Sequence, residues 1–384
     1  KAKDLASKHE KFGLYLQILM WEQKLCIVLD HPVRSIEAIR TEEAEIFAKN
    51  AQINLLLGFY SEIMLLKKQY GYAKGTVREQ LDAKVLFHSS FPSKADCKSN
   101  KAKYYYNLIL SVYYWMTYDH QRAFQFSQSL LGNDGRDILP SDYINGLLQH
   151  ITSSVCVAKF DHVLHGIRIT QAFMEQYKLN QSYKYRLLFF SYDSTYKLIV
   201  YAYTGDQVRL REVIYNSEHQ LDAFREFIPA ELYVIILGNI MNAYMAVGDV
   251  DRAWAISDQL SYSSSKEFRK DIFADLYLFR VFLLLTKQSY DLLSPTVATA
   301  LRFFRKTNEN KLQFQVEYKI VQLFAKEIDC SKPINLNPLL HQARSILKDY
   351  ITEVSGTIGF QEHYTRYIIW FDAIEKKIPY YKAA

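Results

Sequence analysis

Apolar residues recur at helical spacing along nearly the whole chain of 384 residues. The first such stretch, residues 2–29, carries Leu14, Leu16, Ile18, Leu19, Trp21, Leu25 and Val28. Side chains spaced in this way gather on the faces of an α-helix. With only 13 glycines and 8 prolines, the chain also has too few turn residues for a sheet protein with many tight turns. The predicted fold class is therefore all-α.

The N-terminal region is expected to form long helices. One helix is predicted over residues 2–29 and ends at Asp30-His-Pro. A second begins near Val33 and runs to about Tyr70, and any break in it is expected near Asn50. A shorter helix over residues 76–87 follows, and the polar stretch at residues 88–100 is predicted to be a loop.

Two segments further along the chain agree position by position. Residues 114–130 (YWMTYDHQRAFQFSQSL) and 244–260 (YMAVGDVDRAWAISDQL) share Tyr, Asp, Arg-Ala, a bulky aromatic residue, Ser and Leu at the same offsets. We interpret them as copies of one unit, which consists of a helix, a tight turn at an aspartate, and a second helix.

The same unit can be followed from residue 101 to residue 353. Helix pairs are predicted at 101–117 and 120–131, 141–159 and 162–178, 183–203 and 207–223, 230–246 and 250–261, 266–286 and 295–306, and 311–327 and 337–353. A helix at 358–376 is expected to cap them. The turn aspartates are Asp119, Asp161, Asp206, Asp249, Asp291 and Asp329, spaced 42, 45, 43, 42 and 38 residues. An aspartate there can cap the following helix, and Gly205 and Gly248 suit the end of the preceding one. A near-constant period predicts a repeat array.

The unit resembles the tetratricopeptide repeat (TPR). That family has a small residue in the middle of its first helix, a tyrosine three residues later, Gly-Asp at the turn and alanine early in its second helix. Tyr244, Gly248-Asp249 and Ala253 match this pattern. Ser111, Tyr114, Asp119 and Ala123 also match, but the period of 38–45 residues exceeds the family's 34. The resemblance implies a TPR-like α-solenoid, a right-handed superhelix of antiparallel helix pairs. Its expected parts are residues 1–90, an atypical N-terminal segment with a long helix or hairpin, residues 101–355, the repeat array, and residues 356–384, the capping helix.

The resemblance also implies a partner-binding groove on the concave face, lined by the first helix of each pair. Carried over by position, the groove residues are Tyr105, Trp115, Met116, His150, Tyr192, Tyr196, Asn239, Asn242 and Met245. Asn242 lies where members often hold the main chain of a ligand, since an amide can pair with both N–H and C=O. The alternative is that most of these side chains pack between helices. The expected function is a non-catalytic scaffold or adaptor that binds a peptide or partner domain.

Composition argues against several other classes. The net charge of +6 comes from interspersed charges of both signs, whereas nucleic-acid binders usually carry a concentrated basic stripe. The longest uncharged run, residues 232–248, has 17 residues, fewer than the ~20 that span a bilayer. The four cysteines, Cys26, Cys97, Cys156 and Cys330, are far apart, which favours free thiols and a cytoplasmic location.

No familiar catalytic motif is present, and the expectation is neither an enzyme nor a protein with a cofactor or metal. His162 and His165 lie three residues apart, as two metal ligands on a helix could, but a third ligand is lacking. An acid/base cluster could form only if the fold brought together His341, Glu362, His363 and Arg366. One alternative is the sensor or regulatory arm of a longer signalling or transcription protein, since the first residues resemble the tail of a helix. A second is an α-helical enzyme without a familiar motif. Homo-oligomerisation through terminal repeats is a further expectation.

Overall fold

A computed structural model shows helices joined by turns and loops, with no strand among the residues described. It describes residues 1–73, 76–132, 135, 137–261, 270–308, 314–327, 336–353, 358–378 and 380–383, although not the side chains of 271, 308, 353, 358–366, 380 and 381. The chain divides into two compact units, Lys1–Val157 and Ala158–Ala384. The division separates the segments 141–159 and 162–178, which the sequence analysis paired.

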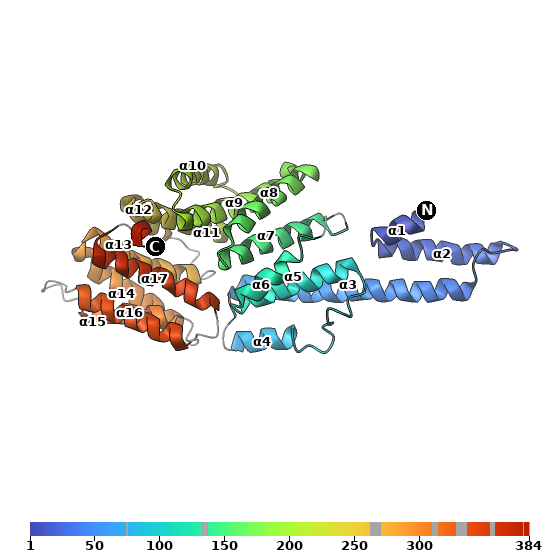
Figure 1. The fold of residues 1–384 in the computed structure, drawn as a ribbon, viewed down its shortest axis with the longest axis horizontal. Coiled ribbons are helices and arrows are strands. Elements are labelled where there is room, and N and C mark those ends of the chain that lie inside the picture. The colour runs from blue at the N-terminus through green and yellow to red at the C-terminus, as the bar shows by residue number, and fades with distance from the viewer. Residues whose placement is uncertain are drawn as a thin grey trace. The chain divides into compact units, whose positions relative to one another are not determined.

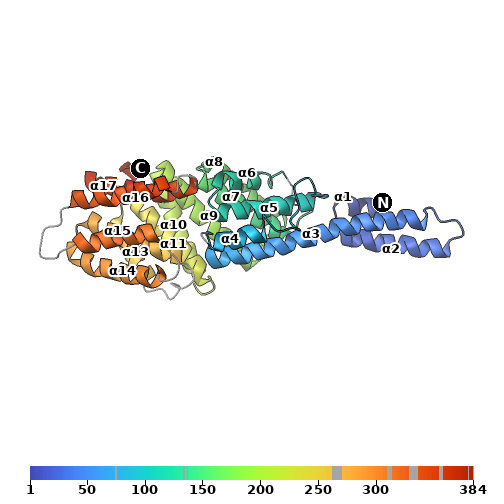
Figure 2. The ribbon, with the colours of Figure 1, turned by 90° about the horizontal axis from the view of Figure 1, so that it is seen from below.

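The first unit consists of α1 (Ala2–Lys8), α2 (Phe12–Val28), α3 (Ile36–Tyr70), α4 (Thr76–Lys84), α5 (Asn100–Met116), α6 (His120–Gln128) and α7 (Pro140–Cys156). In both ribbon views α2 lies along the N-terminal part of α3, whereas α5 lies along its C-terminal part (Figures 1 and 2). The long helix α3 therefore joins an N-terminal hairpin to the α5–α7 layers. Its buried side chains follow this division, with Ile39 and Ile46 in the hairpin and Leu56, Tyr60 and Ile63 beyond it.

Two expectations for this region are corrected. The single helix predicted over residues 2–29 is two helices, because Glu10 adopts a left-handed backbone with φ of 47° and the chain turns there. No glycine or proline at residues 9–11 signals that turn in the sequence. The next helix, α3, has no break near Asn50. It runs from Ile36 to Tyr70 and ends at Gly71, whose φ is 66°.

The second unit continues the all-helical pattern. It contains α8 (Phe160–Gln176), the 3₁₀ turn η1 (Leu179–Gln181), α9 (Tyr183–Thr204), α10 (Gln207–Ala223), α11 (Ala230–Ala246), α12 (Val250–Ser261), α13 (Lys270–Lys287), the 3₁₀ turn η3 (Tyr290–Leu292), α14 (Leu293–Asn308), α15 (Gln315–Glu327), α16 (Leu336–Glu353), α17 (Ile358–Lys376) and α18 (Tyr380–Ala383). Consecutive helices pack against each other, and α9 also packs against α11 and α11 against α13.

A recurrent turn connects the two helices of a pair. A residue with a left-handed backbone, Tyr118, Gly205 or Gly248, is followed in each case by an aspartate. The carboxylates of Asp119, Asp206 and Asp249 each accept the backbone N–H three residues later, at 3.0–3.1 Å. This is the capping role that the sequence predicts for these three aspartates.

The other turn aspartates differ. Asp161 lies inside the first turn of α8, whose N-cap is Lys159, because the left-handed residue is Ala158 and the helix starts two residues earlier than expected. Asp291 lies in η3, again because the chain turns earlier, at Gln288. Asp329, like Cys330, falls outside the described residues.

The C-terminal helix α17 has a second contact besides its neighbour α16. Tyr367, Trp370 and Phe371 pack onto Phe279 and Phe282 of α13, and the Tyr367 hydroxyl donates to the Asp275 carboxylate. These contacts join residues about 90 positions apart in sequence, so α17 covers α13 as well as the end of the helical series.

Candidate interaction surface

In the first unit, three of the predicted groove residues are buried. Tyr105 is 3% exposed, and its hydroxyl donates to Asp142 Oδ2 at 2.6 Å. Burial, with the neighbouring carboxylate, raises the pKa of Tyr105 far above the ordinary range of tyrosine. His150 is fully buried, its Nδ1 lying 3.1 Å from Ser127 Oγ, and Met116 is equally inaccessible. In this conformation none of the three presents a side chain to a partner.

Trp115 is only half-buried, but neighbouring side chains of the same unit cover its ring. Tyr72 stacks on it with ring centroids 4.6 Å apart, and Lys67 Nζ lies 4.7 Å from the ring centroid. Tyr72 also stacks on Tyr118, at 4.1 Å. The indole is thus a member of an aromatic cluster at the ends of α3 and α5.

In the second unit, the neighbouring helices α9 and α11 carry the remaining five residues. Met245 is buried in the packing of α11. Tyr192 and Tyr196 of α9 are half-buried, with ring centroids 5.6 Å apart, and an ion pair between Asp193 and Lys197 at 2.7 Å lies beside them. These tyrosines occupy successive turns of one face of α9, because residues four apart are neighbours on a helix.

Two asparagines of α11 have different roles. Asn239 is half-buried, and its Nδ2 donates to the backbone oxygen of Ile235 at 2.8 Å, which leaves its side-chain oxygen as the group that can accept. Asn242 is exposed, less than one turn further along. We name Tyr192, Tyr196, Asn239 and Asn242 the α9–α11 surface. It offers apolar ring edges together with amide donors and acceptors, the chemistry that binds an extended main chain with apolar side chains.

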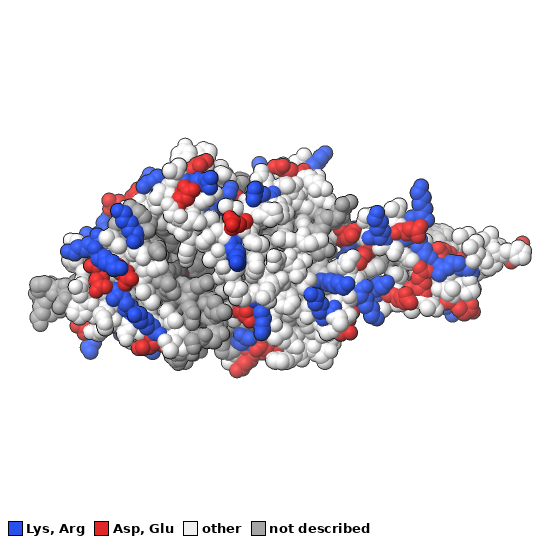
Figure 3. All heavy atoms as spheres, viewed as in Figure 1, with Lys and Arg blue, Asp and Glu red and all other residues white. Residues whose placement is uncertain are grey.

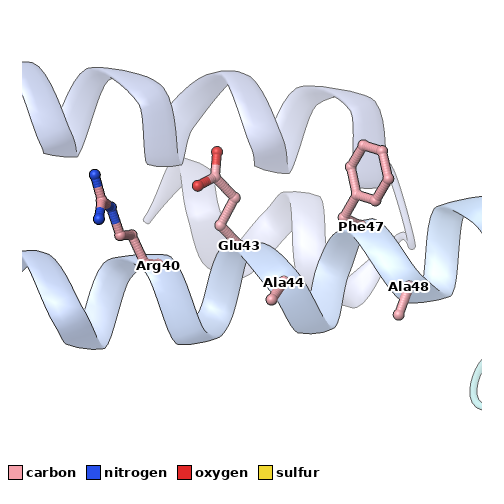
Figure 4. A pocket seen from close by; sticks show the side chains of 5 residues that line it. All are labelled: Arg40, Glu43, Ala44, Phe47 and Ala48. Carbon is pink, nitrogen blue, oxygen red and sulfur yellow. The ribbon is translucent and has the colours of Figure 1, made fainter.

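A shallow pocket opens on the N-terminal hairpin of the first unit. Its lining residues are Arg40, Glu43, Ala44, Phe47 and Ala48, all from α3 (Figure 4). Arg40, Glu43 and Phe47 project from the same side of the helix (Figure 4), and Gln23 Nε2 of α2 donates to Glu43 at 2.9 Å. Nothing in the sequence indicates this pocket, because charged residues such as Arg40 and Glu43 are ordinary on an exposed helix face.

Among the described residues, the candidate metal ligands do not gather into a site. His162 lies in α8 and is half-buried, whereas His165 is exposed. Within the described part of the chain, no group of three or more His, Cys, Asp or Glu residues lies close enough to hold a metal ion. The side chains of Glu362, His363 and Arg366 lie outside that part. Among the same residues, no helix is long and apolar enough to cross a bilayer.

The N-terminal hairpin also exposes apolar residues, which the sequence pattern does not indicate. Helix α2 carries apolar residues on more than one face. Because only one face packs against the rest of the hairpin, some of these residues remain exposed. Leu14, Trp21, Leu25 and Val28 are each more than half exposed.

Comparison of the chain with protein-family models and with curated proteins finds no match.

Proposed function

We propose that the protein is a non-catalytic interaction scaffold, a TPR-like superhelix that binds a peptide or partner domain on the α9–α11 surface. The proposal rests on half-buried tyrosines of α9 and on asparagine amides of α11, two helices that pack against each other. The recurrent aspartate-capped turns support the TPR-like interpretation, because two of the three carry the Gly-Asp pair of that family, at Gly205-Asp206 and Gly248-Asp249.

The mechanism is preorganised recognition. Tyr192 and Tyr196 supply apolar surface on a helix, so little conformational freedom is lost when a partner packs against them. The exposed amide of Asn242 and the free acceptor oxygen of Asn239 can pair with backbone N–H and C=O groups of an extended segment. The preferred ligand is accordingly an extended peptide with an apolar side chain. The cysteines of the protein are far apart in sequence, which favours free thiols and a cytoplasmic location for the protein.

Affinity capture from a cell lysate tests the proposal. Wild-type protein is compared with Asn239→Ala/Asn242→Ala and with Tyr192→Ala/Tyr196→Ala, each checked for unchanged helicity by circular dichroism. Tyr215→Ala is the matched control, since Tyr215 is a tyrosine 69% exposed on the helix α10. We expect a captured protein that binds wild type and Tyr215→Ala equally and both double variants at least about tenfold more weakly. Equal binding by all four proteins, or no specific capture, would contradict the proposal.

A further inference from the structure

The N-terminal hairpin is joined to the rest of the first unit at two points. We call α1, α2 and residues 36–51 of α3 the stalk, and residues 52–157 the body. The first connection is α3 itself, which continues without a break from the stalk into the body. Helices α1 and α2 pack mainly on each other and on α3, and both ribbon views show them beyond the end of α5 (Figures 1 and 2). Among the helix contacts, α3 is thus the main link between stalk and body.

The second connection is the turn between α1 and α2. Glu10 Oε1 accepts the backbone N–H of Asn100 at 2.7 Å, and Oε2 accepts that of Lys101 at 2.8 Å. Lys101 Nζ donates to the backbone oxygen of Glu10 at 2.9 Å, and His9 Nδ1 lies 2.9 Å from Asp137 Oδ1. Apart from the helix hydrogen bonds of α3 itself, every hydrogen bond or ion pair between stalk and body among the described residues involves one of these two turn residues.

Glu10 completes the N-terminus of α5. The first N–H groups of a helix have no partner within it. At the start of α5 the Ser99 hydroxyl accepts the N–H of Ala102 at 3.0 Å. The N–H groups of the two preceding residues are those that Glu10 binds, and its negative charge suits the positive end of the helix dipole. The cap of α5 therefore comes in part from a residue 90 positions earlier in the chain.

The backbone of Glu10 depends on these contacts. Its φ of 47° lies in the left-handed region, which disfavours residues that carry a Cβ. Glycine would adopt this turn more easily, but it has no carboxylate to bind α5. Such a conformation persists where surrounding contacts hold it, and the bonds to α5 and to Asp137 supply those contacts.

A general attraction between charged surfaces does not account for the joint. Figure 3 shows basic and acidic side chains intermixed on the face of the hairpin in view. The carboxylates of Glu22 and Glu42 pair with Lys3 and Arg34 inside the stalk. The specific polar contacts that hold the stalk to the body are therefore those of the turn.

We propose that His9 and Glu10 form a latch that sets the orientation of the stalk on the body. With the latch closed, the stalk is fixed at two points and keeps one angle to α5. With the latch open, α3 alone joins the two parts, and the stalk swings as a folded hairpin, because its own buried residues, including Tyr15, Leu19 and Ile39, lie within it. The latch belongs to the first unit and the α9–α11 surface to the second, so either proposal can fail without the other.

Spin-label distances in the whole chain test the latch. In a chain whose four native cysteines are serine, labelled cysteines replace Val33 at the tip of the stalk and Gln125 on α6, both exposed positions. We expect one narrow distance distribution for the closed latch and a distribution at least about twofold wider for Glu10→Ala, with His9→Ala and Glu10→Gln in between. Glu45→Ala is the matched control, because Glu45 is an exposed glutamate of the stalk without an ion pair among the described residues.

Two outcomes of this experiment would overturn the proposal. If Glu10→Ala gives a distribution as narrow as that of the parent chain, the bonds of the turn do not fix the stalk. If Glu10→Ala instead loses helical content by circular dichroism, the contact is required for folding and is not a latch.

Hydrogen exchange adds a readout at the contact itself. The N–H groups of Asn100 and Lys101 should exchange at least about tenfold faster in Glu10→Ala than in wild type, because the helix offers them no other acceptor. The N–H of Ala102, which Ser99 caps, should keep its exchange rate. Unchanged exchange at Asn100 and Lys101 would show that Glu10 does not bind α5, and the latch would be excluded.

Discussion

Asp119 and Arg122 are joined twice at the turn between α5 and α6. The backbone N–H of Arg122 donates to Asp119 Oδ1 at 3.1 Å, and Arg122 Nε lies 3.4 Å from Oδ2. The Arg122 guanidinium is also 5.4 Å from the centroid of the Tyr114 ring in the preceding helix. Asp206 and Arg209 repeat the arrangement at 3.0 and 3.6 Å, with Arg209 at 5.8 Å from Tyr201. One aspartate–arginine pair thus fixes both helices of the turn.

The first prediction concerns this cap. Asp249→Ala removes the acceptor for the Arg252 N–H, which lies 3.1 Å from Asp249 Oδ1. We expect the free energy of unfolding to fall by about 0.5–2 kcal/mol, the usual cost of losing an N-cap. Urea denaturation followed by circular dichroism measures it. Asp161→Ala is the control, because Asp161 lies after the N-cap residue of α8 and its loss should cost less. If both variants lost the same free energy of unfolding, the side-chain cap at Asp249 would make no specific contribution to stability.

Comparison of Asp161 with Asp119 shows how far the sequence determines this fold. Helical periodicity locates the helices of the repeat region to within a few residues, because each must bury an apolar stripe. The turn is less visible, since its geometry depends on which residue adopts the left-handed backbone. Glycine at positions 205 and 248 indicates the left-handed conformation in the sequence. Tyr118, Ala158 and Gln288 adopt the same conformation, but their residue types do not indicate it.

The surface was harder to predict than the fold. Position in a repeat identifies which side chains lie on the first helix of each pair, but not which of them the next helix covers. Tyr105, His150 and Met245 are covered and Asn242 is not. The exposed residues Leu14, Trp21, Leu25 and Val28 of α2 have the same apolar periodicity as a buried face, so sequence pattern alone cannot distinguish the two.

The second prediction tests close packing between α5 and α7. A Cβ at Gly146 would lie 2.0 Å from the hydroxyl oxygen of Tyr104, which is 1% exposed and donates to the Asp142 backbone oxygen at 3.1 Å. We expect Gly146→Ala to destabilise the protein by about 1–3 kcal/mol, because the overlap outweighs the better helix propensity of alanine. Thermal unfolding followed by circular dichroism measures the change.

A matched glycine and a second-site change make this prediction specific. A Cβ at Gly238, which also lies inside a helix, would have Cγ2 of Ile272 as its nearest neighbour at 3.9 Å, so Gly238→Ala should be neutral or stabilising. Tyr104→Phe removes the clashing hydroxyl, and Gly146→Ala/Tyr104→Phe should recover part of the lost stability. If Gly146→Ala proves as mild as Gly238→Ala, the close approach of α5 and α7 is wrong.

The third prediction is a pH dependence set by His120. This side chain is 4% exposed and lies edge-on to the stacked rings of Tyr72 and Tyr118, and burial lowers its pKa from 6.5 to about 4, although Asp119 opposes the shift. Between these values the unfolded chain binds more protons than the folded one, so stability must fall as pH drops from about 6.5 to 4. The loss can reach about 3 kcal/mol.

Substitution by a ring that does not titrate isolates the effect. His120→Phe keeps an aromatic side chain among the same neighbours, and its free energy of unfolding should vary less with pH over this interval than that of wild type. Urea denaturation at half-unit pH steps measures both proteins. Parallel curves for the two proteins from pH 6.5 to 4 would exclude His120 as the titrating group.

The last prediction concerns the charge network of the N-terminal hairpin. Glu42 of α3 lies 2.8 Å from Lys3 of α1 and 2.6 Å from Arg34, and it accepts the hydroxyl of Tyr15 in α2. Partial burial alone would raise its pKa, but the hydrogen bonds from Lys3, Tyr15 and Arg34 prevail and lower it from 4.5 to about 2. The carboxylate thus stabilises the hairpin fully above pH 4.5, and this contribution is lost as pH falls toward 2.

Glu42→Gln should remove that dependence. We expect the variant to be less stable than wild type at neutral pH by roughly 1 kcal/mol, since partial exposure screens these charges, and the two stabilities should converge as the pH falls. Lys3→Gln, which removes one donor, should give an intermediate slope. Urea denaturation at several pH values below 5 measures all three proteins, and a constant difference between wild type and Glu42→Gln would show that the network does not hold Glu42 ionised.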